Sequence, residues 1–226
     1  MLTGNKDLDH IILNKLDDKD LVNVCQTNHK ADEICKDQNF WMNRILSKFP
    51  SVDMDVLKKY KGSRTWSDYY IYDLRRIIFK ENEIQQAAND GKLDHLIVLM
   101  SKINYDVADL AAGAAVNGHL DVLKYLVDKK GADTRYENDI SLRYASFNGH
   151  TDVVKYLVKR GGDIHVLDDF PLRHAAINGH LDTVKYLVEN GANIHADNEK
   201  YILSTYKRRY GKVVDYLVSK GVRDPR

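Results

Sequence analysis

Three near-copies of one phrase constrain the fold of this chain more than any other feature of its sequence. The phrase is Asn-Gly-His followed by an apolar segment ending in Lys-Tyr-Leu-Val, and it occupies 117–127, 148–158 and 178–188. A period of about 30 residues marks stacked supersecondary units, none of which can bury its apolar face alone. Because such a stack offers a long surface rather than a pocket, the sequence predicts a recognition protein.

The clearest unit, 170–193, shows why each unit predicts two helices. Pro171 suits the first turn of a helix, because its φ is fixed near the helical value. Small apolar residues at helical spacing then share one face: Leu172, Ala175 and Ala176. Gly179 ends this helix, since glycine adopts the left-handed conformation without a Cβ penalty. The second helix carries its own stripe and stops at Gly191: Val184, Leu187 and Val188.

This order of helix, tight turn, helix, glycine and turn resembles the ankyrin repeat. The family pattern, which begins Thr-Pro-Leu-His-x-Ala-Ala-x-x-Gly-His, aligns with 170–192 without gaps. Two positions depart from it: the family's Thr is Phe170 here and Ile140 one unit earlier, and its His is Arg173 and Arg143. The resemblance implies an all-α ankyrin-repeat solenoid of helix–turn–helix units with hairpin loops, preceded by a small helical domain. The departures predict a different cap at the start of each first helix.

Two weaker copies flank the clear ones, so about five repeats are expected: 82–105, 106–136, 137–166, 167–196 and 197–226. The last copy has Arg209 where glycine belongs. Basic residues gather on its surface: Lys207, Arg208, Arg209 and Lys212. Since a terminal repeat needs a polar outer face, we expect this copy to be a polar cap.

Residues 1–50 do not repeat. The Asp20-Leu21 pair, the Val24-Cys25 pair and a closing Trp41 resemble an F-box-like domain, although that family's opening Leu-Pro-x-Glu is missing. The resemblance implies docking to a Skp-type adaptor and presentation of a target to a cullin–RING ubiquitin ligase. The residues it implies for the adaptor contact are Ile11, Ile12, Leu16, Leu21 and Val24.

Residues 51–81 are expected to form a helical linker or packing segment rich in aromatic side chains. In a helix capped by Thr65 or Ser67, four of its residues would face inward: Trp66, Tyr69, Tyr70 and Leu74. We expect them to form core between the two regions. The alternative is that these rings, with nearby basic residues, stack on single-stranded nucleic acid.

The repeat stack is expected to bind a protein target through its loop tips and the exposed faces of the first helices. Phe147 and Ile177 are candidate apolar anchors, beside Arg and Tyr residues of the kind that dominate binding energy. The full set of candidates is Tyr136, Asn138, Arg143, Tyr144, Phe147, Asp168, Asp169, Arg173, His174, Ile177 and Lys207.

The recurring histidines His119, His150 and His180 are predicted to be structural, hydrogen-bonding the tight turns. Packed helices lie about 8–10 Å apart, whereas zinc holds its ligands within about 2.1 Å. Equivalent positions of successive repeats therefore cannot share a metal, and we expect no metal and no cofactor. Because the sequence contains neither a phosphate-binding glycine loop nor a nucleophile motif, we do not expect an enzyme.

Lys and Arg number 34 against 33 Asp and Glu, so the formal net charge is +1. This balance favours a protein partner over a membrane or nucleic acid. The apolar stretches are too short to span a bilayer, and the start lacks the apolar run of a secretory signal. Cys25 and Cys35 match no disulfide framework or zinc motif. We therefore expect free thiols in an intracellular, cytoplasmic and monomeric protein.

The F-box-like start combined with Asn-Gly-His ankyrin units resembles the multigene ankyrin families of giant amoeba-infecting DNA viruses, which would place the protein in a host cell. Two alternatives stay open. The first is a plain ankyrin scaffold whose first 80 residues only cap the stack, which the missing Leu-Pro-x-Glu favours. The second is nucleic-acid binding through the basic stretches at 58–80 and 207–212.

Overall fold

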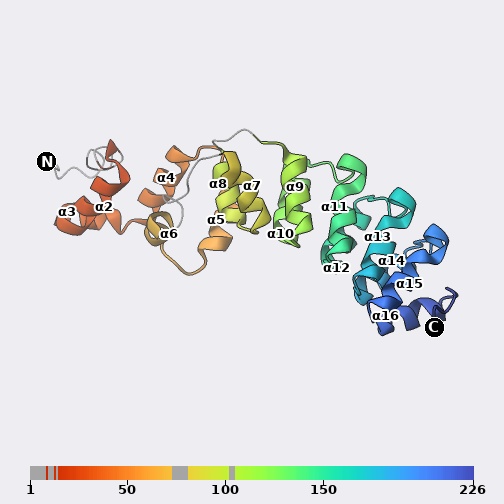
Figure 1. Ribbon diagram of the computed structural model, residues 1–226. Coiled ribbons are helices and arrows are strands. Elements are labelled where there is room, and N and C mark those ends of the chain that lie inside the picture. The colour runs from red at the N-terminus through yellow and green to blue at the C-terminus, as the bar shows by residue number, and fades with distance from the viewer. Residues whose placement is uncertain (1–8, 10–12, 14, 73–80, 102–104) are drawn as a thin grey trace. The chain divides into compact units, whose positions relative to one another are not determined.

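The computed structural model of the chain describes residues 9, 13, 15–72, 81–101 and 105–226. Within them every regular element is a helix (Figure 1), which confirms the all-α prediction. No helix in this part of the chain is both long and apolar enough to cross a membrane. Contacts divide the chain into two compact units, the first comprising 1–84 with 93–104 and the second 85–92 with 105–226.

The first unit holds six described helices: α2 (Asp18–Thr27), α3 (His29–Cys35), α4 (Gln38–Lys48), α5 (Met54–Lys61), α6 (Trp66–Tyr72) and α8 (Leu93–Leu99). Its core centres on Trp41, which donates its ring N–H to the Cys35 carbonyl at 2.6 Å. The Trp41 ring lies 5.7 Å from that of Tyr70. Arg44 is also buried and donates to the Leu16 carbonyl at 2.8 Å. The unit therefore has a core of its own.

The aromatic segment lies in the core of this first unit. The Thr65 hydroxyl accepts the Asp68 backbone N–H at 3.1 Å, so Thr65 is the cap of α6. The rings of Trp66, Tyr69 and Tyr70 are buried as predicted, and Leu74 lies outside the described residues. The Tyr69 hydroxyl donates to Asp94 on α8 at 2.8 Å. Since these rings are buried, they offer no face on which a nucleic-acid base could stack.

The prediction of free thiols is wrong. Cys25 in α2 and Cys35 at the end of α3 form a disulfide, with their Cα atoms 5.9 Å apart. The chain turns at Asn28 between the two helices, which pack on each other. This turn brings Cys25 and Cys35 together although they are ten residues apart in sequence. Sequence spacing alone did not reveal this fold-back, and the two cysteines therefore give no support to a reducing compartment.

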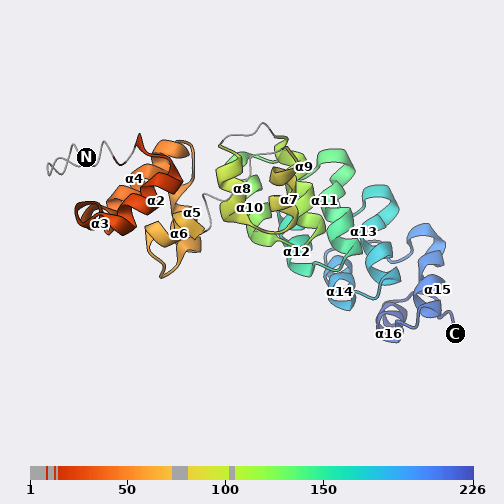
Figure 2. The ribbon, with the colours of Figure 1, turned by 60° about the vertical axis from the view of Figure 1, so that its left-hand side comes forward.

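The second unit consists of two rows of helices (Figures 1 and 2). The first helices of successive repeats pack side by side: α9 (Val107–Val116), α11 (Tyr136–Phe147), α13 (Val166–Ile177) and α15 (Lys200–Lys207). The second helices form the other row: α10 (Leu120–Lys130), α12 (Thr151–Lys159), α14 (Leu181–Glu189) and α16 (Gly211–Ser219). A short 3-10 turn, η2 (Ala196–Glu199), precedes α15, and α7 (Glu81–Asn89) lies before the first row in sequence.

The apolar register predicted for 170–193 is confirmed. Leu172, Ala175 and Ala176 are fully buried, as are Val184 and Leu187 of the second helix, while Val188 is half-buried. The small alanine side chains let neighbouring first helices approach closely. Gly179 (φ +80°) and Gly191 (φ +98°) end the two helices in the left-handed region.

The recurring histidines are structural, as predicted, and each ring bonds the tight turn of the preceding repeat. The His180 ring hydrogen-bonds the Phe147 carbonyl at 2.9 Å, and the His150 ring bonds the Val116 carbonyl at 3.0 Å. The ring of His180 lies so close to Gly149 that a Cβ at this glycine would clash with it. Glycine is therefore required at position 149 for two reasons: its φ is positive, and the His180 ring fills the space that a Cβ would need.

The last repeat departs from the predicted polar cap. Its Arg209 occupies the glycine position with φ +65°, and its side chain is exposed together with Lys207, Arg208 and Lys212. However, Leu203 and Tyr206 of α15 are also exposed. The surface of α15 is therefore partly apolar as well as basic.

Candidate partner-binding surface

Three turns of the second unit contain runs of left-handed backbone: two interrupt the beginnings of α11 and α13, and the third lies in η2, before α15. All three residues of each run have a positive φ, between 46° and 61°: 137–139, 167–169 and 197–199. Non-glycine residues in this conformation cost about 1 kcal/mol or more each. Contacts from the surrounding structure must therefore hold these turns, which form the different cap expected from the sequence.

The arginine that replaces the family's histidine closes each of the first two turns. Arg173 donates from Nε to the Asp168 carbonyl at 2.7 Å and from Nη2 to the Leu167 carbonyl at 2.9 Å. Arg143 donates in the same way to the Asn138 carbonyl at 2.9 Å and to the carbonyl before it at 3.0 Å. These two guanidinium groups bind main-chain oxygens, so they stabilise the left-handed turns.

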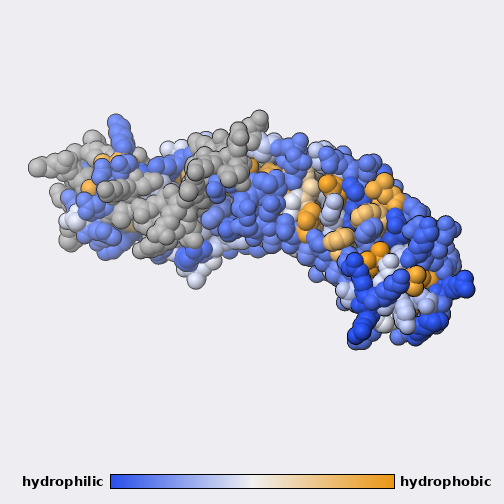
Figure 3. Space-filling view, viewed as in Figure 1, coloured by the Kyte–Doolittle hydropathy of each residue, from blue (hydrophilic) through white to orange (hydrophobic). Residues whose placement is uncertain are grey.

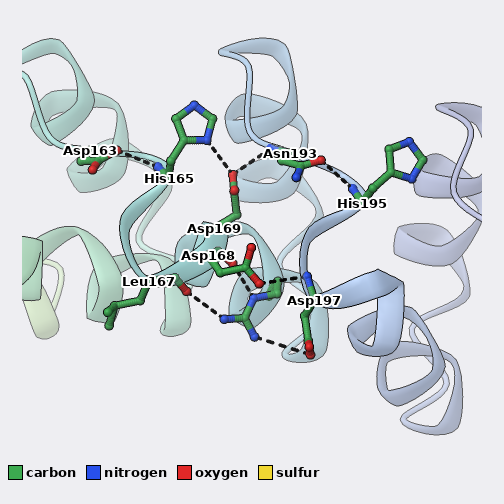
Figure 4. Close-up of polar contacts among 9 residues, drawn as sticks. Asp163, His165, Leu167, Asp168, Asp169, Asn193, His195 and Asp197 are labelled. Carbon is green, nitrogen blue, oxygen red and sulfur yellow. Dashed lines mark hydrogen bonds and ion pairs between the residues drawn. The ribbon is translucent and has the colours of Figure 1, made fainter.

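An acidic side chain at the third position of each turn binds the loop that follows the second helix of the same repeat. The Asp169 carboxylate is buried and accepts the Asn193 backbone N–H at 2.7 Å, and His165 donates to it at 3.1 Å (Figure 4). The equivalent carboxylates bond 24 residues ahead in the same way: Asp139 to the Asp163 N–H and Glu199 to the Arg223 N–H. Asp169, predicted to contact a partner, is therefore buried and fastens the two ends of its own repeat instead.

Aromatic and cationic side chains gather on the first helices α11 and α13. We call them the inner-helix cluster, which consists of Arg143, Tyr144, Phe147, Phe170 and His174. Phe170 and His174 stack with ring centroids 3.6 Å apart, and His174 lies 6.0 Å from Phe147. The Arg143 guanidinium lies over both the Tyr144 and Phe170 rings, at 5.8 and 5.6 Å. Tyr144 and Phe147 remain 40% and 39% exposed. The cluster therefore offers fixed apolar rings to solvent.

Burial lowers the pKa of His174, with a further lowering from the charge of Arg173. The imidazole is thus neutral at neutral pH, which suits its stacking between two phenylalanine rings. Figure 3 shows apolar residues gathered over α11 and α13, with hydrophilic residues around them. The cluster can bury apolar side chains of a partner against its rings, which Arg143 holds in place by cation–π contacts.

The other predicted surface residues lie around this cluster. Ile177 is half-buried on α13, and Lys207 is exposed on α15. Asn138 and Asp168 are exposed in the left-handed turns, and Tyr136, where the carboxylate of Asp109 raises the pKa of the phenol, is half-buried.

Sequence reasoning missed two surface residues. Phe170 was treated only as a departure from the family pattern, yet it is the ring on which His174 stacks. Leu167 is 53% exposed in its turn. The available signal was an apolar residue at a position where the neighbouring repeats carry acids, Glu137 and Asp197.

The residues implied for an adaptor contact lie in different environments. Ile11 and Ile12 fall outside the described residues. Leu16 and Val24 are half-buried, and Leu21 is fully buried. Leu21 therefore supports the core of the first unit and offers no surface to a partner.

The comparison with known families agrees with the repeat geometry. The sequence model described as Ankyrin repeats (3 copies) matches residues 84–168 and 142–225, which together cover more than half of the chain. The chain belongs to the ankyrin-repeat family. No curated protein matches it. Ankyrin repeats are protein–protein interaction modules, and the second unit is one of them. The F-box-like and viral resemblances rest on the sequence alone.

Proposed function

We propose that the chain is a substrate-recruiting adaptor, in which the ankyrin unit holds a protein target and the first unit docks a Skp-type subunit of a cullin–RING ubiquitin ligase. The observation that carries target binding is the inner-helix cluster. Its exposed Tyr144 and Phe147 rings beside Arg143 are the residue types that dominate interface energies. The bonds between repeats hold the rings in place, and a preorganised surface loses less entropy on binding.

Target binding is tested by replacing Phe147 with the photo-crosslinking residue p-benzoylphenylalanine in the full-length chain. Illumination in a cell extract should yield adducts with polypeptides. A second form carries the same residue at Lys155, which is exposed on the second helix α12, and should yield few. Equal labelling from both positions, or no polypeptide adduct from Phe147, would exclude the cluster as the target site.

Two facts support the adaptor role: the resemblance at Asp20-Leu21, Val24-Cys25 and Trp41, and the separate core of the first unit. A pull-down of the full chain with a Skp-type adaptor tests it. Leu16→Glu and Val24→Glu change half-buried residues, and both should abolish retention of the adaptor. Leu46→Glu, at an exposed leucine of α4, is the control. Circular dichroism should show that all variants remain helical.

No retention of the adaptor by the unchanged protein would leave a plain ankyrin scaffold, with the first unit as its cap. If Leu46→Glu abolished retention of the adaptor as fully as Leu16→Glu and Val24→Glu do, the contact would not be specific to the surface around Leu16 and Val24. A location in the cytoplasm, where such ligases act, is part of the same proposal.

A further inference from the structure

We propose that the target is an acidic–apolar polypeptide segment that crosses the first helices of the last three repeats. Its apolar side chains lie over α11 and α13, and its carboxylates lie over α15. The inference rests on the proposed target binding and adds to it the chemistry and the direction of the bound segment.

Beyond the left-handed turns, which carry acidic residues, the remainder of α11, α13 and α15 with the turn that follows each carries charge of one sign. The segments 140–149, 170–179 and 200–211 contain six Lys or Arg residues and no Asp or Glu. The six are Arg143, Arg173, Lys200, Lys207, Arg208 and Arg209. Because the whole chain carries 34 basic and 33 acidic residues, this is a local segregation of charge. An acidic ligand complements it.

Only one end of this row has cations available to a ligand. Arg143 and Arg173 already bind main-chain carbonyls of the left-handed turns. Lys207 and Arg209, at the end of α15, are exposed. Since α11, α13 and α15 pack in that order, the free positive charge lies at the α15 end, beside the exposed Leu203 and Tyr206. The α11 end offers the exposed rings of Tyr144 and Phe147 without a free cation.

This polarity selects a peptide over a nucleic acid. A single-stranded nucleic acid carries a phosphate at every nucleotide and binds along a continuous cationic groove. Over α11 the cationic group is that of Arg143, which is bonded to the turn. Exposed carboxylates also stand beside the row, at Glu137 and Asp168. A polypeptide can place apolar side chains at one end and carboxylates at the other, as the surface requires.

The test is selection of a random peptide library, displayed on phage, against the immobilised full-length chain. We expect enriched peptides that combine aromatic or aliphatic residues with a run of Asp or Glu. Their affinities are then measured by fluorescence anisotropy for the unchanged protein and for a Lys207→Glu, Arg209→Glu double variant. This variant should bind about tenfold more weakly or worse, because opposed charges become like charges.

A matched control reverses two exposed lysines at the ends of second helices, Lys129→Glu and Lys159→Glu. It changes the net charge equally and should leave the affinity within about twofold, since surface charges beyond a Debye length are screened. Phe147→Ser should also weaken binding, and circular dichroism should show that the variants stay folded.

The inference is overturned if no peptide is enriched, if the enriched peptides lack acidic residues, or if both double variants lose affinity alike. Tighter binding of a single-stranded oligothymidylate than of any selected peptide would also overturn it. Polypeptide adducts from the photo-crosslinker at Phe147 together with neutral or basic selected peptides would leave target binding intact and refute only the acidic chemistry. Absence of both would refute the two proposals together.

Discussion

The Asp169 carboxylate accepts a hydrogen bond of 2.7 Å from the Asn193 backbone N–H, 24 residues ahead at the other end of the same repeat. The carboxylate is buried, so losing it leaves the partly buried Asn193 N–H without its acceptor. Charge-assisted hydrogen bonds of this kind contribute about 2 kcal/mol. Asp169→Ala should lower the free energy of unfolding of the second unit by about that amount, measured by urea denaturation.

Glu189→Ala is the control for this change, because Glu189 is an exposed acid at the end of α14. It should alter the free energy of unfolding by less than about 0.5 kcal/mol. Equal effects from the two variants would show that the loss of a negative charge, not of the hydrogen bond to Asn193, is what lowers the stability.

Substitutions at two glycines with positive φ distinguish the cost of backbone strain from the cost of losing a contact between repeats. Gly149 (φ +75°) has no room for a Cβ beside the His180 ring, whereas Gly161 (φ +90°) faces open space. Gly161→Ala should cost about 1 kcal/mol of stability for the left-handed backbone alone. Gly149→Ala should cost about 2–3 kcal/mol, because it also displaces the ring from the Phe147 carbonyl. Urea denaturation of both variants measures the difference, and equal losses would contradict the contact.

The buried hydroxyl of Ser146 is a point where the fold is less stable than it could be. Ser146 is fully buried in α11, and its Oγ has no hydrogen-bond partner within the part of the chain that the structure describes. The equivalent residue one repeat later is Ala176. Ser146→Ala should therefore raise the free energy of unfolding by about 1 kcal/mol, since an unpaired polar group no longer has to be desolvated. A decrease in thermal midpoint would reveal an unseen partner of the hydroxyl.

The disulfide gives a prediction that is confined to the first unit. Joining Cys25 to Cys35 closes a short loop and should stabilise that unit by about 2–3 kcal/mol through the entropy of its unfolded chain. Cys25→Ser with Cys35→Ser should lower its unfolding midpoint by a corresponding amount. Thiol titration of the denatured protein should find free cysteines only after reduction. Two reactive thiols before reduction would contradict the pairing.

The repeat architecture could be predicted from the sequence because its determinants are local. The face formed by Leu172, Ala175 and Ala176 and the stop at Gly179 follow from helical spacing and from the freedom of glycine. Both are found as expected. The exposed Phe147 was also identified, because an apolar residue near the end of an otherwise polar helix face has little local purpose.

The left-handed turns could not be predicted, because the contacts that hold them form only when the repeat has folded. Nothing local indicates that 167–169 adopt three left-handed conformations in a row, since the intrinsic preference of such residues opposes it. Only the folded repeat brings the Asn193 N–H to Asp169 and places the Arg173 guanidinium over the carbonyls of the turn. The Cys25–Cys35 pair was missed because two cysteines at this spacing match no known disulfide framework, and the packing of α2 on α3 that brings them together is a tertiary contact.

The ring of His150 couples the stability of the stack to pH. Burial lowers the pKa of His150 below its usual 6.5, and the neighbouring rings of His119 and His180 lower it further. In the unfolded chain the same histidine takes up a proton near pH 6.5. As the pH falls below 6.5, the unfolded state therefore binds more protons than the folded state, and stability is lost until the folded pKa is passed. Above pH 6.5 this contribution is constant.

His150→Gln should flatten that dependence, because a glutamine amide can still donate to the Val116 carbonyl that His150 bonds at 3.0 Å but does not titrate. The measurement is thermal unfolding of both proteins between pH 7.5 and 5. The unchanged protein should lose more of its unfolding midpoint over this range than the variant does. His95→Gln is the control, because His95 lies in the first unit on α8 and its loss should leave the slope unchanged. Parallel curves for the unchanged protein and His150→Gln would show that the proton uptake occurs elsewhere.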